Sequence, residues 1–143
     1  MIKSVNLGEE LVITTKNKVG IMADIATMLA NQGVNIEAVA AYESGKSAKL
    51  LLVTNANIRI VGELRKKGYK SLKETEVIMV ELEDKPGALK VVTTELKKRR
   101  IDIKYLYVTS SYLGGSSRLV MQTSDNEKAI ALLTKYLEKN SAS

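Results

Sequence analysis

Two short segments combine a polar side chain with a glycine three positions later, Asn17-Lys18-Val19-Gly20 and Asp84-Lys85-Pro86-Gly87. Each lies between an apolar run that predicts a strand and an amphipathic run that predicts a helix. A glycine there permits a left-handed backbone and close approach of a ligand, and the N-terminus of the following helix favours an anion. Binding of a small ligand is therefore one interpretation of each turn. The other is structural: Asn17 or Asp84 caps the helix and Pro86 starts it.

Composition disfavours catalysis. The 143 residues include no His and no Cys, so the commonest proton-transfer group, the thiolate nucleophile and the commonest transition-metal ligands are all missing. The carboxylates of Glu81, Glu83 and Asp84 form a short acidic cluster, but no further ligand spacing supports a metal there, and we expect a solvated strand end. We predict a protein that is not an enzyme and that has neither metal nor cofactor.

The net charge of +6 comes largely from basic clusters at Arg65-Lys66-Lys67 and Lys97-Lys98-Arg99-Arg100. Both clusters fall at the ends of predicted helices, where cations complement the helix dipole. RNA-recognition domains stack bases on aromatic residues of their third strand, and the corresponding strands here, Lys49–Val53 and Arg118–Met121, contain none. The absence of aromatic residues on these strands argues against a nucleic-acid partner, and any such binding should be weak and salt-sensitive.

No stretch approaches the roughly 20 apolar residues that cross a bilayer, and the N-terminus lacks the pattern of a signal peptide. Together with the absence of cysteine, these features predict a cytoplasmic protein without a membrane partner.

The chain repeats itself. Gly20 and Gly87 are 67 positions apart, and the same offset pairs Lys18 with Lys85. From the turns of the predicted hairpins onward the offset becomes 69, pairing Thr54 with Thr123, because the second copy has gained two residues at the flexible turn Leu113-Gly114-Gly115-Ser116. We infer two diverged copies of one unit.

Periodicity predicts the same order of elements in both copies. In the first copy the expected elements are a strand at 11–15, a helix from about 21 that ends at Gly33, strands at 35–43 and 49–54, a helix at 57–67 and a strand at 69–74. This βαββαβ order is typical of a ferredoxin-like sandwich, an α+β fold with an antiparallel sheet and helices on one face. We predict two tandem sandwiches, as domains 1–74 and 75–143.

The second copy is expected to lack its last strand. After a predicted helix at about 125–137, only the polar segment Glu138–Ser143 remains. An edge left unpaired in this way exposes backbone hydrogen-bonding groups that another strand can satisfy. The N-terminal segment Ile2–Leu7 is one candidate for that position, and a second chain in a homodimer is another.

The turn Asp84–Leu89, with Ile101-Asp102-Ile103 about fourteen residues after its glycine, resembles an ACT domain, and Gly20 followed by Gly33-Val34-Asn35-Ile36 resembles another. The resemblance covers roughly residues 10–137. It implies a regulatory module that binds an amino acid where two such domains pair side by side, with the ligand between a first turn and a neighbouring second strand.

Carried over by position, the resemblance implies ligand-binding residues in the first copy at Asn17, Val19, Gly20, Ile21, Asn35 and Ile36. The second copy offers a weaker site at Asp84, Pro86, Gly87, Ala88 and Asp102. An asparagine can both donate and accept, whereas an ionised aspartate can only accept, so the sites should differ.

The resulting hypothesis is a non-catalytic, homodimeric sensor of an amino acid that controls a partner enzyme or regulator. The alternative is a protein–protein docking module whose ligand site has degenerated.

Overall fold

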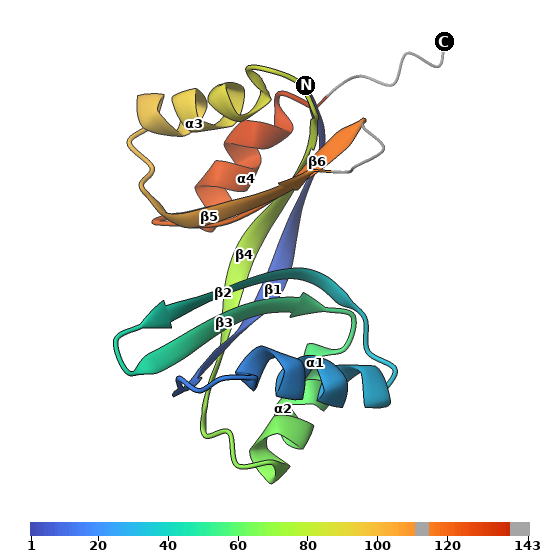
Figure 1. The fold of residues 1–143 in the computed structure, drawn as a ribbon. Helices are drawn as coiled ribbons and strands as arrows, with labels where there is room; N and C mark the ends of the chain where they lie inside the picture. The colour runs from blue at the N-terminus through green and yellow to red at the C-terminus, as the bar shows by residue number, and fades with distance from the viewer. Residues whose placement is uncertain (111–114, 138–143) are drawn as a thin grey trace. The chain divides into compact units, whose positions relative to one another are not determined.

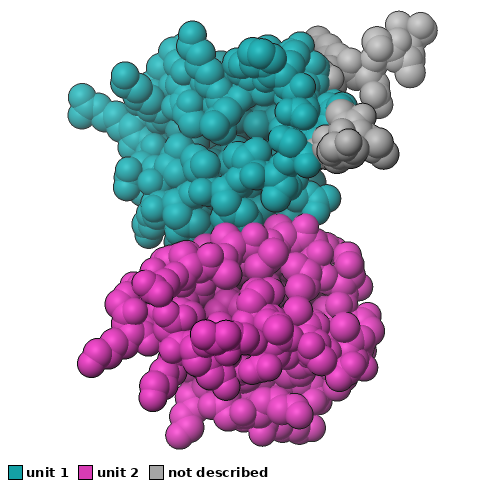
Figure 2. Space-filling model, in the orientation of Figure 1, with its two compact units in different colours: residues 1–8, 76–143 teal, residues 9–75 magenta. Residues whose placement is uncertain are grey.

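The computed structural model describes residues 1–110 and 115–137, and it divides into two compact units (Figure 2). Unit 2 comprises residues 9–75, and unit 1 comprises residues 1–8 and 76–143. The boundary after residue 75 lies one residue from the expected one. Residues 1–8, which we expected in the first domain, instead group with the second half of the chain. No helix in the described ranges is long and apolar enough to cross a membrane.

Unit 2 has the predicted order of elements (Figure 1). They are the second half of β1 (Ile2–Lys16), α1 (Ile21–Asn31), β2 (Ile36–Ser44), β3 (Ser47–Thr54), α2 (Asn57–Lys66) and the first residues of β4 (Ser71–Glu83). Strand β3 pairs antiparallel with both β1 and β2. Both helices lie on one face of these strands, and Ile25, Leu29, Leu50, Ile60 and Leu64 form part of the core between the two layers.

The end of α1 confirms one local prediction. Gly33 has φ 69°, and the N–H groups that close the helix are those of Gly33, donating to Ala30 O over 3.0 Å, and of Val34, donating to Leu29 O over 3.0 Å. A residue without a side chain takes this left-handed conformation at little cost. The glycine therefore both ends the helix and redirects the chain toward β2.

Unit 1 is built from the second half of β4 and the elements that follow it. These are α3 (Ala88–Lys98), β5 (Ile103–Ser110), β6 (Ser116–Thr123) and α4 (Asn126–Thr134). Strand β6 pairs antiparallel with β4 and β5, and α3 and α4 cover one face (Figure 1). The predicted turn at Leu113-Gly114 and the tail Glu138–Ser143 lie outside the described residues.

The edge expected to be vacant in unit 1 is filled by the first half of β1. The N–H of Glu83 donates to Met1 O over 2.8 Å, while a Cβ on Gly8 would lie 2.8 Å from Met79 Sδ, so this segment runs antiparallel to β4. Ile2 is fully buried in the core of unit 1. The prediction that the N-terminal segment supplies the missing strand is confirmed.

The two units share a hydrogen-bonded motif at the start of their second helices. In unit 2, Asn57 Oδ1 accepts from the N–H of Thr54 over 3.1 Å, and Asn57 Nδ2 donates to Glu9 O over 3.0 Å. Equivalent bonds in unit 1 join Asn126 to Thr123 and Glu76. Asn57 and Asn126 are 69 positions apart, the offset found in the sequence. The repeat in the sequence pairs Thr54 with Thr123, but the importance of Asn57 and Asn126 is visible only in the structure.

The end of α3 carries a strained residue. Arg100 has φ 57° and is the one described residue other than glycine with a positive φ. It occupies the position of Gly33 in α1, 67 residues earlier. Because a side chain disfavours this conformation by roughly 1 kcal/mol, Arg100→Gly should raise the free energy of unfolding of unit 1 by about that amount. Urea unfolding measures the change; a stability equal to or below that of the native protein would contradict it.

Candidate functional site

The turn between β1 and α1 is open at its glycine. Gly20 has φ 87° and directly precedes α1, and apart from its chain neighbours no atom of the described residues lies within 4 Å of the position that a Cβ would occupy. No side chain of the described residues caps α1, so the alternative interpretation of Asn17 as the cap of this helix is wrong. The N–H groups of Met22 and Ala23 have no acceptor among the described residues. The first turn of α1 is therefore able to receive an anionic group.

Asn17 is instead held by the tip of the β2–β3 hairpin. Its Nδ2 donates to Glu43 Oε2 over 2.8 Å, and its backbone N–H donates to Lys46 O over 2.9 Å. The amide oxygen is thereby left to accept a further hydrogen bond, as an ammonium group requires. Sequence reasoning missed Glu43, although the predicted hairpin already brings its tip beside the end of the first strand.

Charge and exposure differ among the other residues of the turn. Lys18 Nζ lies 3.7 Å from Asp24 Oδ2, and both side chains are more than half exposed, so this ion pair adds little to stability. Val19 is fully exposed. Ile21 is buried in the core of unit 2 and anchors the start of α1. The turn thus presents the Val19 side chain and free N–H groups to solvent, and the buried Ile21 side chain holds the turn against the core.

Asn35 lies far from Asn17 within unit 2. It is exposed beside the start of β2, where its N–H donates to Asn55 Oδ1 over 3.3 Å. The half-buried Ile36 pairs with Thr54 at one end of β3, whereas Lys16 pairs with Ser47 at the other. At about 3.3 Å per residue, seven residues of β3 separate these ends by about 23 Å. One unit alone does not bring Asn17 and Asn35 to the same small ligand.

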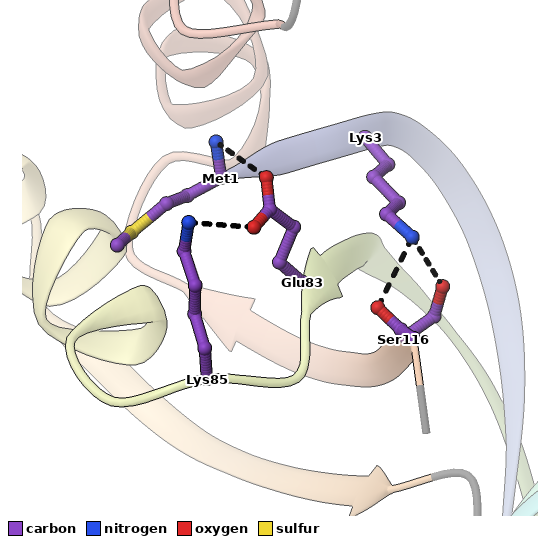
Figure 3. Close-up of polar contacts among 6 residues, drawn as sticks. Met1, Lys3, Glu83, Lys85 and Ser116 are labelled. Carbon is purple, nitrogen blue, oxygen red and sulfur yellow. Dashed lines mark hydrogen bonds and ion pairs between the residues drawn. The ribbon is translucent and has the colours of Figure 1, made fainter. Parts of the chain in front are cut away.

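The corresponding turn in unit 1 is partly covered by the start of the chain (Figure 3). Gly87 has φ 89°, and Met1 Cε lies 3.9 Å from the position of a Cβ there. Glu83 lies between the two segments: its Oε1 is 3.7 Å from the Met1 amine and its Oε2 is 2.7 Å from Lys85 Nζ. Glu83 of the acidic cluster is therefore engaged by two cations. At Gly20, no residue in the described ranges other than its chain neighbours comes within 4 Å of the equivalent position.

The two aspartates of the second-copy site lie near opposite ends of β6, as Asn17 and Asn35 lie near opposite ends of β3. The N–H of Asp84 donates to Gly115 O over 3.2 Å at the start of β6, whereas Asp102 O accepts from the N–H of Ser124 over 2.9 Å just beyond its end. Pro86 is exposed and Ala88 is buried. As in α1, no side chain caps α3, so Asp84 is not a cap either.

Residues 11–66 match the family model described as an AHAS small subunit-like ACT domain. Among solved structures, protein BT0572 from Bacteroides thetaiotaomicron is similar with a TM-score of 0.84 and 21% identity, over 92% of this chain and 90% of that one. The ligand-free regulatory subunit of aspartate kinase from Thermus thermophilus matches with a TM-score of 0.65 and 10% identity, over 96% and 100% of the two chains.

The aspartokinase alpha and beta subunits match with a TM-score of 0.63 and 14% identity, over 94% of this chain and 97% of that one. At such identities the likeness establishes the fold, an α+β ferredoxin-like arrangement with antiparallel strands and helices. No curated protein matches the chain in sequence.

Proposed function

We propose that the chain is an ACT-domain regulator, on the basis of the family match over residues 11–66 of unit 2, and that it is non-catalytic and binds a small amino acid at the Gly20 turn. The observation that carries this proposal is the combination at that turn of an open glycine position, free N–H groups and an oriented Asn17 amide. The ligand carboxylate lies at the first turn of α1, where the helix dipole favours an anion. The ligand ammonium group lies at Asn17 Oδ1.

The proposed ligand bridges two copies of the chain. Because Asn17 and Asn35 sit at opposite ends of β3 within unit 2, Asn35 contributes only if it comes from a second copy. Strand β2 is the outer strand of unit 2, so it offers unpaired backbone groups to a matching strand. Occupancy then shifts the population toward the homodimer, and this shift is the signal passed to a partner enzyme or regulator.

The Gly20 turn is proposed as the stronger of two sites in a tandem ACT arrangement. A regulatory subunit of aspartate kinase shares this fold. We propose a regulatory role for this chain because it has the same fold. At the other turn, Met1 occupies part of the space beside Gly87, and Asp84 replaces the asparagine. A protein–protein docking module without a ligand remains the second candidate function, favoured by the full exposure of Val19.

A thermal-shift screen against the twenty amino acids tests the proposal. A ligand at about 100 times its dissociation constant should stabilise the fold by roughly 2.7 kcal/mol, which raises the Tm of a protein of this size by roughly 5–10 °C. Asn17→Ala, Asn35→Ala and Gly20→Val should each remove that shift. The ligand should also raise the dimer fraction in sedimentation measurements.

Gly87→Val is the matched control for Gly20→Val. The two glycines have nearly the same φ, 89° and 87°, so both substitutions strain the backbone alike, and Gly87→Val should leave most of the ligand shift. Asp102→Ala should likewise matter less than Asn35→Ala. The ligand site is refuted, and the docking alternative preferred, if no amino acid shifts the Tm by even about a degree or if the Asn17 and Asn35 variants retain the full shift.

A further inference from the structure

A groove of about 540 Å³ opens between α1 and α2 of unit 2, and neither Asn17 nor Gly20 is among its lining residues. The lining includes Met28, which is 9% exposed, and the half-buried Tyr69. The exposed side chains of Asn31 and Lys67 also line it and have no polar partner among the described residues. The volume lies within the range of small-molecule sites.

The same position in unit 1 is bridged by side chains. With the offsets of the repeat, Met28 corresponds to Glu95, Asn31 to Lys98, and Lys67 to Tyr136. Lys98 Nζ lies 3.1 Å from Glu95 Oε1, and the hydroxyl of Tyr136 donates to the Glu95 carboxylate. That hydrogen bond lowers the pKa of Glu95 and raises the pKa of Tyr136. Lys98 and Glu95 thus pair within α3, and Glu95 joins α3 to Tyr136 just beyond the end of α4, whereas Met28, Asn31 and Lys67 make none of these bonds among the described residues of unit 2.

We propose that the α1–α2 groove of unit 2 is a second ligand site, which binds a small organic carboxylate with an apolar body. The two carboxylates of the lining are already paired, Asp24 with Lys18 over 3.7 Å and Glu63 with Lys66 over 3.6 Å. The Lys67 ammonium and the Asn31 amide remain as donors, and a carboxylate is the group they bind. Met28 and the Tyr69 ring receive the apolar body.

Ligand-observed saturation-transfer NMR with 3-phenylpropanoate as the probe tests the site on the full chain. Its uncharged analogue 3-phenylpropanamide tests the contribution of the carboxylate charge. The small acetate ion, which has no phenyl ring, tests the contribution of the apolar body. For a probe of this size we expect a dissociation constant on the order of millimolar. The amide and acetate should each bind about fivefold more weakly or worse, as should 3-phenylpropanoate to Lys67→Gln, because an exposed ion pair contributes modestly.

The methyl signal of Met28 locates the probe. The chain has five methionines, and with ¹³C-methyl labelling the Met28 signal should shift saturably while those of Met79 and Met121 in unit 1 stay unchanged. Equal binding of 3-phenylpropanoate and its amide, or shifts confined to other methionines, would overturn the proposal.

A graft from unit 1 provides the matched variant. The triple substitution Met28→Glu, Asn31→Lys and Lys67→Tyr installs the side chains of Glu95, Lys98 and Tyr136. The Glu95 side chain is 13% exposed in unit 1, close to the 9% of Met28, so a glutamate with these partners is compatible with that degree of burial. The graft should fold, as circular dichroism would verify, and should lose probe binding. Asn17→Ala should leave probe binding unchanged, which separates this site from the amino-acid site. A folded graft that binds the probe as the native chain does would show that the groove is not the site.

Discussion

Replacing Asn57 with alanine should lower the free energy of unfolding of unit 2 by about 2–4 kcal/mol. The Asn57 side chain is 9% exposed. Its oxygen accepts from the N–H and the hydroxyl of Thr54, and its amide nitrogen donates to Glu9 O. Alanine leaves the buried Thr54 groups and the part-buried Glu9 carbonyl without this partner, and each unsatisfied buried group costs roughly 1–3 kcal/mol. The substitution therefore loosens α2 from both β3 and β1.

Asn126→Ala is the matched control for Asn57→Ala, because it removes the same bonds from unit 1. Asn126 is only half-buried, and water can replace part of what is lost, so its effect should be about half as large. Urea unfolding combined with hydrogen exchange of β3 and β6 assigns each loss to its unit. A change below about 0.5 kcal/mol for Asn57→Ala, the size typical of surface substitutions, would contradict the prediction.

Ile2→Asp should unfold unit 1 while leaving unit 2 folded. Ile2 is fully buried among Ile78, Val80 and Leu82, and it belongs to the segment that fills the edge beside β4. Placing a carboxylate in this core loses the apolar contacts and buries an unpaired charge, a combination that typically costs about 4 kcal/mol or more. Such a loss is comparable with the whole stability of a small domain.

Leu7→Asp is the control for Ile2→Asp, since it places the same charge on the same half of β1 at a side chain that is 54% exposed. We expect it to change stability by less than about 1 kcal/mol. Hydrogen exchange should show lost protection at Ile78–Leu82 and retained protection at Leu50–Leu52 in Ile2→Asp. Retained protection in unit 1 would mean that residues 1–8 are dispensable for that fold.

Local patterns in the sequence predicted the order of the elements but not all of their bounds, since the strand expected at 11–15 is the longer β1 (Ile2–Lys16). Apolar spacing and the glycines at 20, 33 and 87 predicted the strand-to-helix turns and the end of α1, and the change of offset from 67 to 69 residues placed an insertion at the β5–β6 turn. These features depend on periodicity and on backbone conformations that few residues other than glycine adopt, so they can be read from neighbouring residues alone.

Pairings between distant segments were decided by the tertiary structure. The sequence offered Ile2–Leu7 as one candidate for the edge of unit 1, and only the folded chain shows it antiparallel to β4 and anchored by Ile2. The family resemblance also assigned Asn17 and Asn35 to a ligand site between paired domains, and the register of β3 places them at opposite ends of one unit. Which edge a strand covers, and which side chains converge on one ligand, depend on contacts between residues far apart in the chain, and no local periodicity encodes them.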